Sequence, residues 1–145
     1  MTIGSIARWH QAARHEPTAS DLRVQIGCHL EEVAEMLEAL EPLTHDTDGL
    51  LFATLAGLQA LSERLKSGSC DVVISSRANA LDALCDQIVT AVGVAHCAGM
   101  RIEDALAEVD RANWSKFVDG QPLRDANGKI TKGPQYEAPC LEGMY

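Results

Sequence analysis

The sequence contains few aromatic residues, which make up only 4% of its 145 residues. Its apolar residues, 46% of the total, are mostly Leu, Ala and Val. Helices favour this mixture, whereas strands are enriched in aromatic and β-branched residues. The composition therefore argues against a sheet sandwich and predicts helices packed on helices, in a chain long enough to bury a core.

The sequence also has no pair of cysteines in CxxC spacing. An odd and dispersed set of cysteines argues against both a disulfide framework and a zinc site. Two of them, Cys85 and Cys97, lie in apolar stretches and are predicted to be small core residues. The remaining three are Cys28, Cys70 and Cys140.

Long apolar runs are missing as well. None approaches the ~20 residues that a helix needs to cross a bilayer. The N-terminus lacks the charged and then apolar layout of a secretion signal. We therefore expect a cytoplasmic protein that has no membrane partner.

Positive charge is scarce, since 12 Lys and Arg residues stand against 21 Asp and Glu, a formal net charge of -9. Such a balance repels the phosphate backbone of DNA and RNA, so a nucleic-acid polymer is not an expected partner. A single nucleotide is compatible with this charge, because a divalent cation reverses the local field at an acidic site.

Helix breakers and caps divide the chain into five predicted helices. The first ends before Pro17, which cannot continue a helix. The second begins at Ser20 or Asp21, both good N-caps, and the fourth ends with Gly99 as its C-cap. The predicted ranges are 3–14, 20–40, 46–66, 71 or 76 to 98, and 101 or 102 to 116.

The fold predicted from these segments is an all-α bundle of four to five helices over residues 1–118. A loop-rich tail follows over residues 119–145, with several Gly and Pro and little periodicity. A tail of this length in an ordered domain is usually functional. We assign it to the same domain as the helices.

Acidic residues gather on the second predicted helix, in the stretch HLEEVAEMLEAL. Glu32 and Glu35 are i,i+3 neighbours and Glu31 and Glu35 are i,i+4 neighbours, so their carboxylates can converge. Mg²⁺ prefers carboxylate and water oxygens and would relieve their repulsion. A solvated acidic face explains the pattern equally well, because Glu31, Glu35 and Glu38 lie opposite the leucines.

The fourth predicted helix carries Asp82 and Asp86 beside an apolar face. A carboxylate in such surroundings is costly to bury unless it is paired or coordinated. A salt bridge or an exposed seam would account for both residues. Two acidic helices in one bundle also suggest a shared metal site, which helical bundles build from facing carboxylates.

Four segments taken in order, LEEVAE, LDALCDQIVTAVG, ALAEVDRANWSKF and GKITKGPQYEAP, resemble the all-α nucleoside triphosphate pyrophosphohydrolases. This group comprises the MazG-like enzymes, dimeric dUTPases and phosphoribosyl-ATP pyrophosphohydrolase. The resemblance runs from about residue 8 to residue 140. It implies hydrolysis of an NTP or dNTP to the monophosphate and pyrophosphate, with Mg²⁺ or Mn²⁺ held by an ExxE helix and an ExxD helix.

Carried over by position, the resemblance implies Glu32 and Glu35 as metal ligands, with Asp86 as the last acid of the second motif. Glu31 and Glu35 are the candidates for the general base. Ala83 stands where relatives have an acidic residue, and Asp82, one position earlier, is the candidate replacement. The resemblance also implies attack of water at the α-phosphorus.

The same resemblance implies the substrate-binding residues. Asn113 in RANWSKF is expected to contact the nucleotide or the metal shell, and Lys116 a phosphate. Trp9 and His10 resemble the family's segment near the base pocket, although Trp9 is equally explained as a core residue. In the tail, Lys132 and Tyr136 are expected to close over the phosphates. The alternatives are that Lys116 caps the helix C-terminus and that Lys132 is a solvated lysine.

In its short length and general similarity, though not in a specific motif, the chain resembles the phage MazZ type most, which acts on dGTP and GTP. Relatives form dimers or tetramers, so we expect a homodimer or homotetramer. The alternative is a non-catalytic helical interaction module with a degenerate metal site, which Ala83 favours. Retention of Asn113, Lys116 and KGPQY favours the enzyme.

Overall fold

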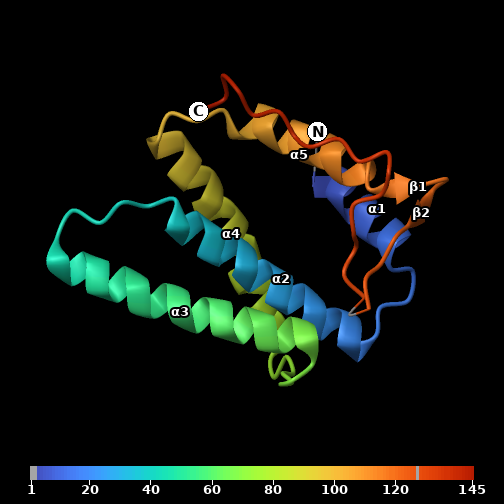
Figure 1. Cartoon of the computed structure of the whole chain (residues 1–145), viewed down its shortest axis with the longest axis horizontal. Helices are drawn as coiled ribbons and strands as arrows, with labels where there is room; N and C mark the ends of the chain where they lie inside the picture. Colours follow the sequence, from blue (N-terminus) through green and yellow to red (C-terminus); the bar gives the residue numbers. More distant parts are fainter. Residues whose placement is uncertain (1–2, 127) are drawn as a thin grey trace. The chain divides into compact units, whose positions relative to one another are not determined.

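The computed structural model describes residues 3–126 and 128–145 and confirms the all-α prediction (Figure 1). The helices are α1 (Ile3–Ala13), α2 (Ala19–Glu38), α3 (His45–Ser67), α4 (Arg77–Cys97) and α5 (Ile102–Trp114). Two short strands, β1 (Phe117–Val118) and β2 (Gln121–Pro122), form an antiparallel hairpin. The sequence did not predict this β-hairpin.

The ends of the helices follow local side-chain caps. Thr18, and not Ser20 or Asp21, is the N-cap of α2: its hydroxyl accepts from the Asp21 backbone, and the Asp21 carboxylate accepts from the Thr18 backbone. This reciprocal pair is a capping box. Ser76 caps α4, and Gly99, with a φ of 74°, follows its C-cap Ala98.

The chain divides into two compact units, each of which is described by itself. The hairpin unit contains residues 16–72 with the short tail segment 126–129, and is built on α2 and α3. The tail unit contains residues 1–15, 73–125 and 130–145, and holds α1, α4, α5 and the two strands.

In the hairpin unit, α2 packs against the second half of α3, where Ser62 and Leu65 are buried, whereas Leu50 and Phe52 in its first half are exposed (Figure 1). Gly27 makes the close approach possible, because a Cβ there would lie 2.9 Å from Lys66 Cγ and 3.0 Å from the Ser62 carbonyl oxygen. The buried Ser62 hydroxyl donates to the Gly27 carbonyl at 2.8 Å. Leu65 and Val24 are fully buried at this crossing.

The tail unit has a small core in which Trp9 and Ala13 of α1 meet Phe117 and Ile130 of the tail. The Trp9 indole N–H donates to the carbonyl of Asn113 at 2.9 Å, which ties α1 to α5. An isolated β-bridge between Arg124 and Ile130 continues the strand pairing beyond the β1–β2 hairpin. The segment predicted as irregular is therefore partly paired and contributes to a core.

Arg111 on α5 fastens the last part of the tail. Its guanidinium forms a two-pronged pair with Glu108, at 2.9 and 2.7 Å, and a third bond to Glu137 at 2.8 Å. Glu108 also accepts from the backbone N–H of Cys140 at 2.9 Å. Hydrogen bonds from Arg111 and Cys140 lower the pKa of Glu108 to about 2.

We expect the tail contact of Glu108 to weaken in acid. Because its pKa falls on folding from 4.5 to about 2, its contribution is fully present above pH 4.5 and is lost as the pH falls toward 2. The protection of the Cys140 amide against hydrogen exchange should fall over that pH range, relative to the protection of the amides of α5. Glu108→Gln should remove this pH dependence; an unchanged acid profile in that variant would contradict the assignment.

Most of α4 is exposed, from Leu81 through Val94. Cys85 and Cys97 are exposed too, so the prediction that they are core residues is wrong. The helix is also long and apolar enough to cross a membrane, with a mean hydropathy of 1.2, contrary to the sequence-based expectation that no stretch approaches that length. One such helix is weak evidence for a membrane, because helices of soluble proteins meet the same criterion.

Candidate functional site

The carboxylates predicted from the sequence lie together on α2. Glu32 and Glu35 are exposed, and Glu31 is half-buried. Among the residues described, Glu35 has neither a hydrogen bond nor an ion pair, which leaves both of its oxygens open to a ligand. Three carboxylates therefore lie within two turns of one helix.

Glu31 differs from its neighbours because two lysines hold it. Lys66 of α3 pairs with one carboxylate oxygen at 2.5 Å, and Lys129 of the tail pairs with the other at 3.0 Å. Partial burial raises the pKa of Glu31, but the hydrogen bonds and charges of Lys66 and Lys129 outweigh this effect, and the pKa is lowered overall. Glu31 is therefore a weaker proton acceptor than an unpaired glutamate.

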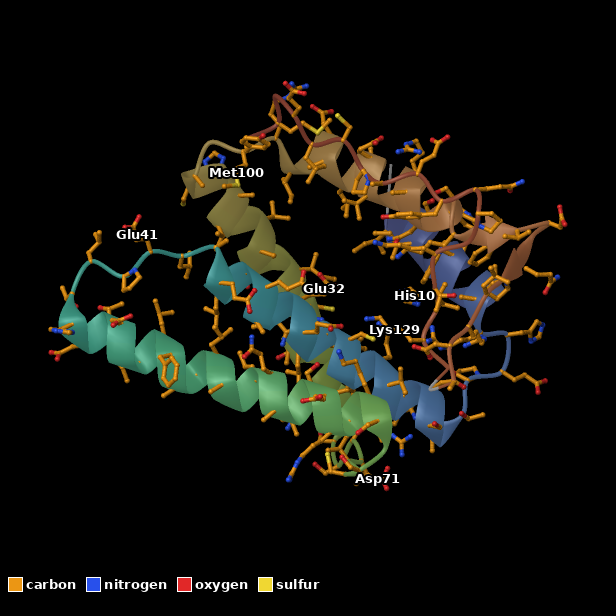
Figure 2. All side chains as sticks on the ribbon, in the orientation of Figure 1. His10, Glu32, Glu41, Asp71, Met100 and Lys129 are labelled. Carbon is orange, nitrogen blue, oxygen red and sulfur yellow. The ribbon has the colours of Figure 1, made fainter. Side chains whose placement is uncertain are left out.

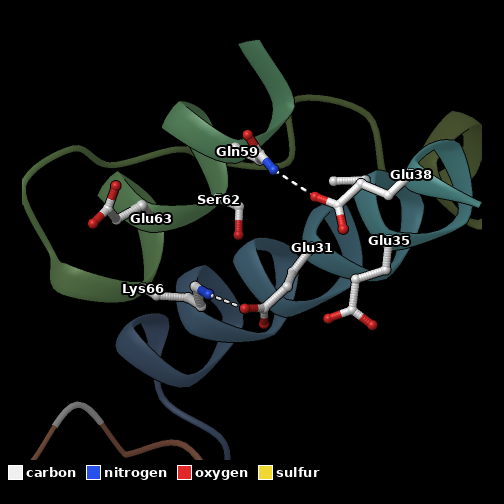
Figure 3. A pocket seen from close by; sticks show the side chains of 8 residues that line it. Glu31, Glu35, Glu38, Gln59, Ser62, Glu63 and Lys66 are labelled. Carbon is white, nitrogen blue, oxygen red and sulfur yellow. Dashed lines mark hydrogen bonds and ion pairs between the residues drawn. The ribbon is translucent and has the colours of Figure 1, made fainter. Parts of the chain in front are cut away.

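A pocket of about 330 Å³ opens between α2 and α3 beside these residues (Figure 3). Gln59 donates to Glu38 at 2.7 Å on one side of it, and the Lys66–Glu31 pair lies on the other. The Glu35 carboxylate lies between Glu31 and Glu38 along the helix. The lining residues are Glu31, Ala34, Glu35, Glu38, Gln59, Ser62, Glu63 and Lys66.

Asp82 and Asp86 lie on α4, in the tail unit, and both are exposed. Within residues 3–126 and 128–145, no cluster of three or more His, Cys, Asp or Glu side chains has the arrangement of a metal site. The two predicted acidic motifs thus belong to different units, and their Glu32, Glu35, Asp82 and Asp86 side chains are exposed.

Carboxylates such as those on α2 are nevertheless the donor type that Mg²⁺ prefers. Magnesium in nucleotide sites is usually held by one or two carboxylates together with water and substrate phosphates, and it does not need a cage made only of protein. Glu32 and Glu35 are exposed carboxylates, and Glu35 has no partner in the described chain. A site of this open kind requires no third ligand from the same helix.

The two segments on which the family resemblance most depends come together in the tail unit. Asn113 lies in the last turn of α5, whereas Lys116 lies just beyond the end of the helix at Trp114, and not within its last turn as predicted. The Lys116 ammonium donates to the Asn113 side-chain oxygen at 2.7 Å. Gly133 of KGPQY packs against this segment: a Cβ there would lie 3.4 Å from the Lys116 carbonyl oxygen.

Lys132 and Tyr136 flank that glycine and contact each other. The Lys132 ammonium lies 4.9 Å from the centre of the Tyr136 ring, a cation–π contact. Lys132 is exposed and Tyr136 is half-buried. The four residues predicted to bind the nucleotide and its phosphates thus form two pairs within one unit, Asn113 with Lys116 and Lys132 with Tyr136.

The residues predicted to read the base differ in their accessibility. Trp9 is 8% exposed and packs against Phe117, so the structure places it in the core of the tail unit. His10 is half-buried and meets Trp9 edge to face. Burial and the charge of Arg14 lower the pKa of His10, which keeps the imidazole neutral near pH 7.

Sequence reasoning missed Lys66 and the role of Lys129. Neither belongs to a motif, and each meets Glu31 across a long stretch of chain, 35 residues for Lys66 and 98 for Lys129. No local pattern in the sequence indicates Lys66.

Comparison with protein-family models, with curated proteins and with solved structures gave no match.

Proposed function

We propose that this chain is a metal-dependent (deoxy)nucleoside triphosphate pyrophosphohydrolase of the cytoplasm, with a lean toward dGTP and GTP. The observation that carries the proposal is the exposed Glu35 carboxylate on α2, which has no partner within the described chain. The five-helix fold agrees with the family resemblance. The product pair would be the nucleoside monophosphate and pyrophosphate.

Glu32 and Glu35 of α2 are the proposed ligands of Mg²⁺, for which Mn²⁺ would substitute. The sequence motif alone assigns Asp86 and Asp82 of α4 to the same function. When bound, the ion neutralises phosphate charge and lowers the pKa of a coordinated water. Glu35 is better placed than Glu31 to accept the water's proton, because Lys66 and Lys129 occupy both oxygens of Glu31.

Residues of the tail unit are proposed to bind the substrate. Lys116 and Lys132 carry the positive charge that a triphosphate requires, and Asn113 and Tyr136 position these ammonium groups. His10, neutral and half-exposed, is suited to hydrogen-bond a base edge. The burial of Trp9 supports a role in holding His10 and Asn113 in place, through the ring contact and the indole hydrogen bond.

The test is pyrophosphate release from a panel of the common NTPs and dNTPs, each with Mg²⁺ and with Mn²⁺. The proposal expects metal-dependent release from at least one nucleotide and none after chelation. Preference for dGTP or GTP would support the substrate lean. No turnover of any nucleotide with either metal would reject the enzyme and leave the helical interaction module.

That alternative module has one specific observation in its favour. Within the described residues no three His, Cys, Asp or Glu side chains are arranged to hold a metal ion, and Ala83 occupies the position where relatives carry an acid. A degenerate metal site would show both features. The module predicts the exposed face of α4 as its working surface and predicts no metal affinity on α2.

We also propose that the chain forms a homodimer or homotetramer through α4. Its exposed apolar side chains include Leu81, Ile88, Val89 and Val92, of which Val89 is 67% exposed. Exposed apolar patches of this kind mark protein contacts. The partner proposed here is a second copy of the same helix, since two copies would cover each other's apolar face.

Val89→Glu is expected to convert the assembly to a monomer, because a buried carboxylate at the contact would lack a partner. Light scattering should then give a mass near 15.6 kDa in place of a multiple of it. Val73→Glu, at an exposed loop position of the same unit, is the matched control and should leave the mass unchanged. A monomeric wild type would rule out the assembly.

A further inference from the structure

The last part of the chain, residues 137–144, runs antiparallel along α5 and is termed the C-terminal strap (Figure 2). Beside the end of α5, the Glu137 backbone N–H donates to the Ser115 hydroxyl at 2.9 Å. Beside the start of the helix, the Arg101 backbone N–H donates to the Met144 carbonyl at 2.8 Å. The strap therefore follows α5 over the whole length of the helix.

Arg111 binds the strap between these two ends. Its guanidinium pairs with the Glu137 carboxylate at 2.8 Å and donates to the Ala138 carbonyl at 3.2 Å. Two further bonds hold the same guanidinium on Glu108, which in turn accepts from the Cys140 backbone N–H. Because the guanidinium is a rigid planar fork, these bonds together fix the strap in one register on α5.

Ser115 joins the strap to the segments that carry the predicted phosphate contacts. It lies directly before Lys116, and Glu137 lies directly after the KGPQY segment, residues 132–136. The half-buried Ser115 hydroxyl accepts from the Glu137 backbone and donates to the Ala112 carbonyl of α5 at 2.7 Å. One side chain therefore holds the end of the KGPQY segment against the end of α5, next to Lys116.

The other end of the KGPQY segment is held by packing. A Cβ at Gly133 would lie 2.8 Å from Val118 Cγ2 and 3.2 Å from Leu123 Cδ1, so the backbone lies close against β1 and the residue after β2. The Tyr136 backbone N–H donates to the Gly133 carbonyl at 3.1 Å, which closes a turn within the segment. The backbone that carries Lys132 is thus restrained at both ends.

We propose that Ser115 and Arg111 are positioning residues, which fix Lys132 relative to Lys116 so that the two lysines bind one chain of linked phosphates. This inference rests on the proposed function for the choice of a polyphosphate ligand. Neither positioning residue needs to touch that ligand, because Ser115 acts through the backbone of Glu137 and Arg111 through its carboxylate.

The effect follows from the entropy of binding. Two ammonium groups bind a polyphosphate best when their backbones are fixed before the ligand arrives, because a loose segment must be ordered at the expense of affinity. The contact between Lys132 and the Tyr136 ring restrains the lysine within the KGPQY segment. The bonds of Ser115 and Arg111 restrain the segment relative to α5, which carries Lys116 just beyond its end.

The first test measures hydrogen exchange at the Glu137 amide by NMR, in the full chain without ligand. Ser115→Ala removes the acceptor of this amide and should lower its protection about fivefold or more, whereas Ser115→Thr keeps the hydroxyl and the protection. The matched control is Ser67→Ala at the end of α3, whose hydroxyl likewise donates to the carbonyl three residues earlier, that of Arg64, at 3.2 Å. This control should leave Glu137 unchanged. Full protection of Glu137 in Ser115→Ala would overturn the proposal.

The second test measures the binding of inorganic tripolyphosphate by titration calorimetry, without metal or nucleotide. Ser115→Ala should bind it about three- to tenfold more weakly than wild type, the cost of ordering a segment that is no longer held. Arg111→Lys keeps the charge but loses the planar fork, and should weaken binding in the same range. Ser115→Thr and Ser67→Ala should keep the wild-type affinity. Unchanged affinity in Ser115→Ala, or no binding by wild type, contradicts the positioning role.

The outcomes separate this inference from the enzyme proposal. If tripolyphosphate affinity falls in the Ser115 and Arg111 variants but wild type hydrolyses no nucleotide, the positioning role stands and the enzyme proposal fails. If nucleotide is hydrolysed with the same KM in Ser115→Ala and wild type, the enzyme stands and the positioning role fails. Where both are correct, KM in Ser115→Ala should rise about three- to tenfold while kcat stays within about twofold, since phosphate contacts hold substrate and transition state alike.

Discussion

Replacing Glu35 with alanine is expected to lower kcat/KM for pyrophosphate release at least about a hundredfold while leaving the fold intact. A residue acting as base or metal ligand contributes on this scale. Glu35 is exposed and has no partner within the described chain, so its removal breaks no structural contact. It also relieves repulsion from Glu31 and Glu38, so the melting temperature should stay level or rise slightly.

The matched control is Glu38→Gln, one turn further along α2. Glu38 lines the same pocket and accepts from Gln59, but it is assigned no chemical function. Its activity should remain within about threefold of wild type, since an amide retains the hydrogen bond. Equal losses in the two variants would indicate a general effect of charge on α2, and full activity in Glu35→Ala would contradict the assignment of Glu35.

Gly27→Leu is expected to destabilise the α2–α3 hairpin by about 3 kcal/mol or more. Even a Cβ at this position would lie 3.0 Å from the Ser62 carbonyl oxygen and 3.2 Å from Leu65 Cβ, so the helices would have to separate. Separation would also break the buried bond from the Ser62 hydroxyl to the Gly27 carbonyl. The favourable helix propensity of leucine offsets only about 1 kcal/mol of this cost.

The control for Gly27 is Gly57→Leu on α3, where a Cβ would meet no atom within 4 Å. That variant should be more stable than wild type by about 0.5–1 kcal/mol, because only the helix propensity changes. Urea unfolding followed by far-UV circular dichroism is the measurement. Both tryptophans, Trp9 and Trp114, lie in the tail unit and would not report on the hairpin. Equal stabilities for the two variants would refute the close crossing.

The helices were predictable because their signals are local. Pro17, Ser76 and Gly99 act within a turn of the ends they set, and the observed helices begin and end close to the predicted residues. Thr18 was missed because Ser20 and Asp21 carry equally good capping side chains, and the reciprocal bond between Thr18 and Asp21 decides among them.

The neighbours of the site were less predictable. The i,i+3 and i,i+4 spacings predicted that the carboxylates of Glu31, Glu32 and Glu35 can converge. Lys66 and Lys129, by contrast, reach Glu31 through the tertiary fold. Cys85 and Cys97 were predicted to be core residues because they lie in apolar stretches, but both are exposed. An apolar stretch indicates which face of a helix tends to be buried. It does not indicate whether residues of the same chain pack against that face.

The most direct test of the central claim is the fate of oxygen from ¹⁸O-labelled water during hydrolysis of the preferred nucleotide. Attack at the α-phosphorus predicts one labelled oxygen in the nucleoside monophosphate and none in pyrophosphate, by mass spectrometry of both products. Label in pyrophosphate would place the attack at the β-phosphorus. Release of orthophosphate with a nucleoside diphosphate would contradict the proposed reaction altogether.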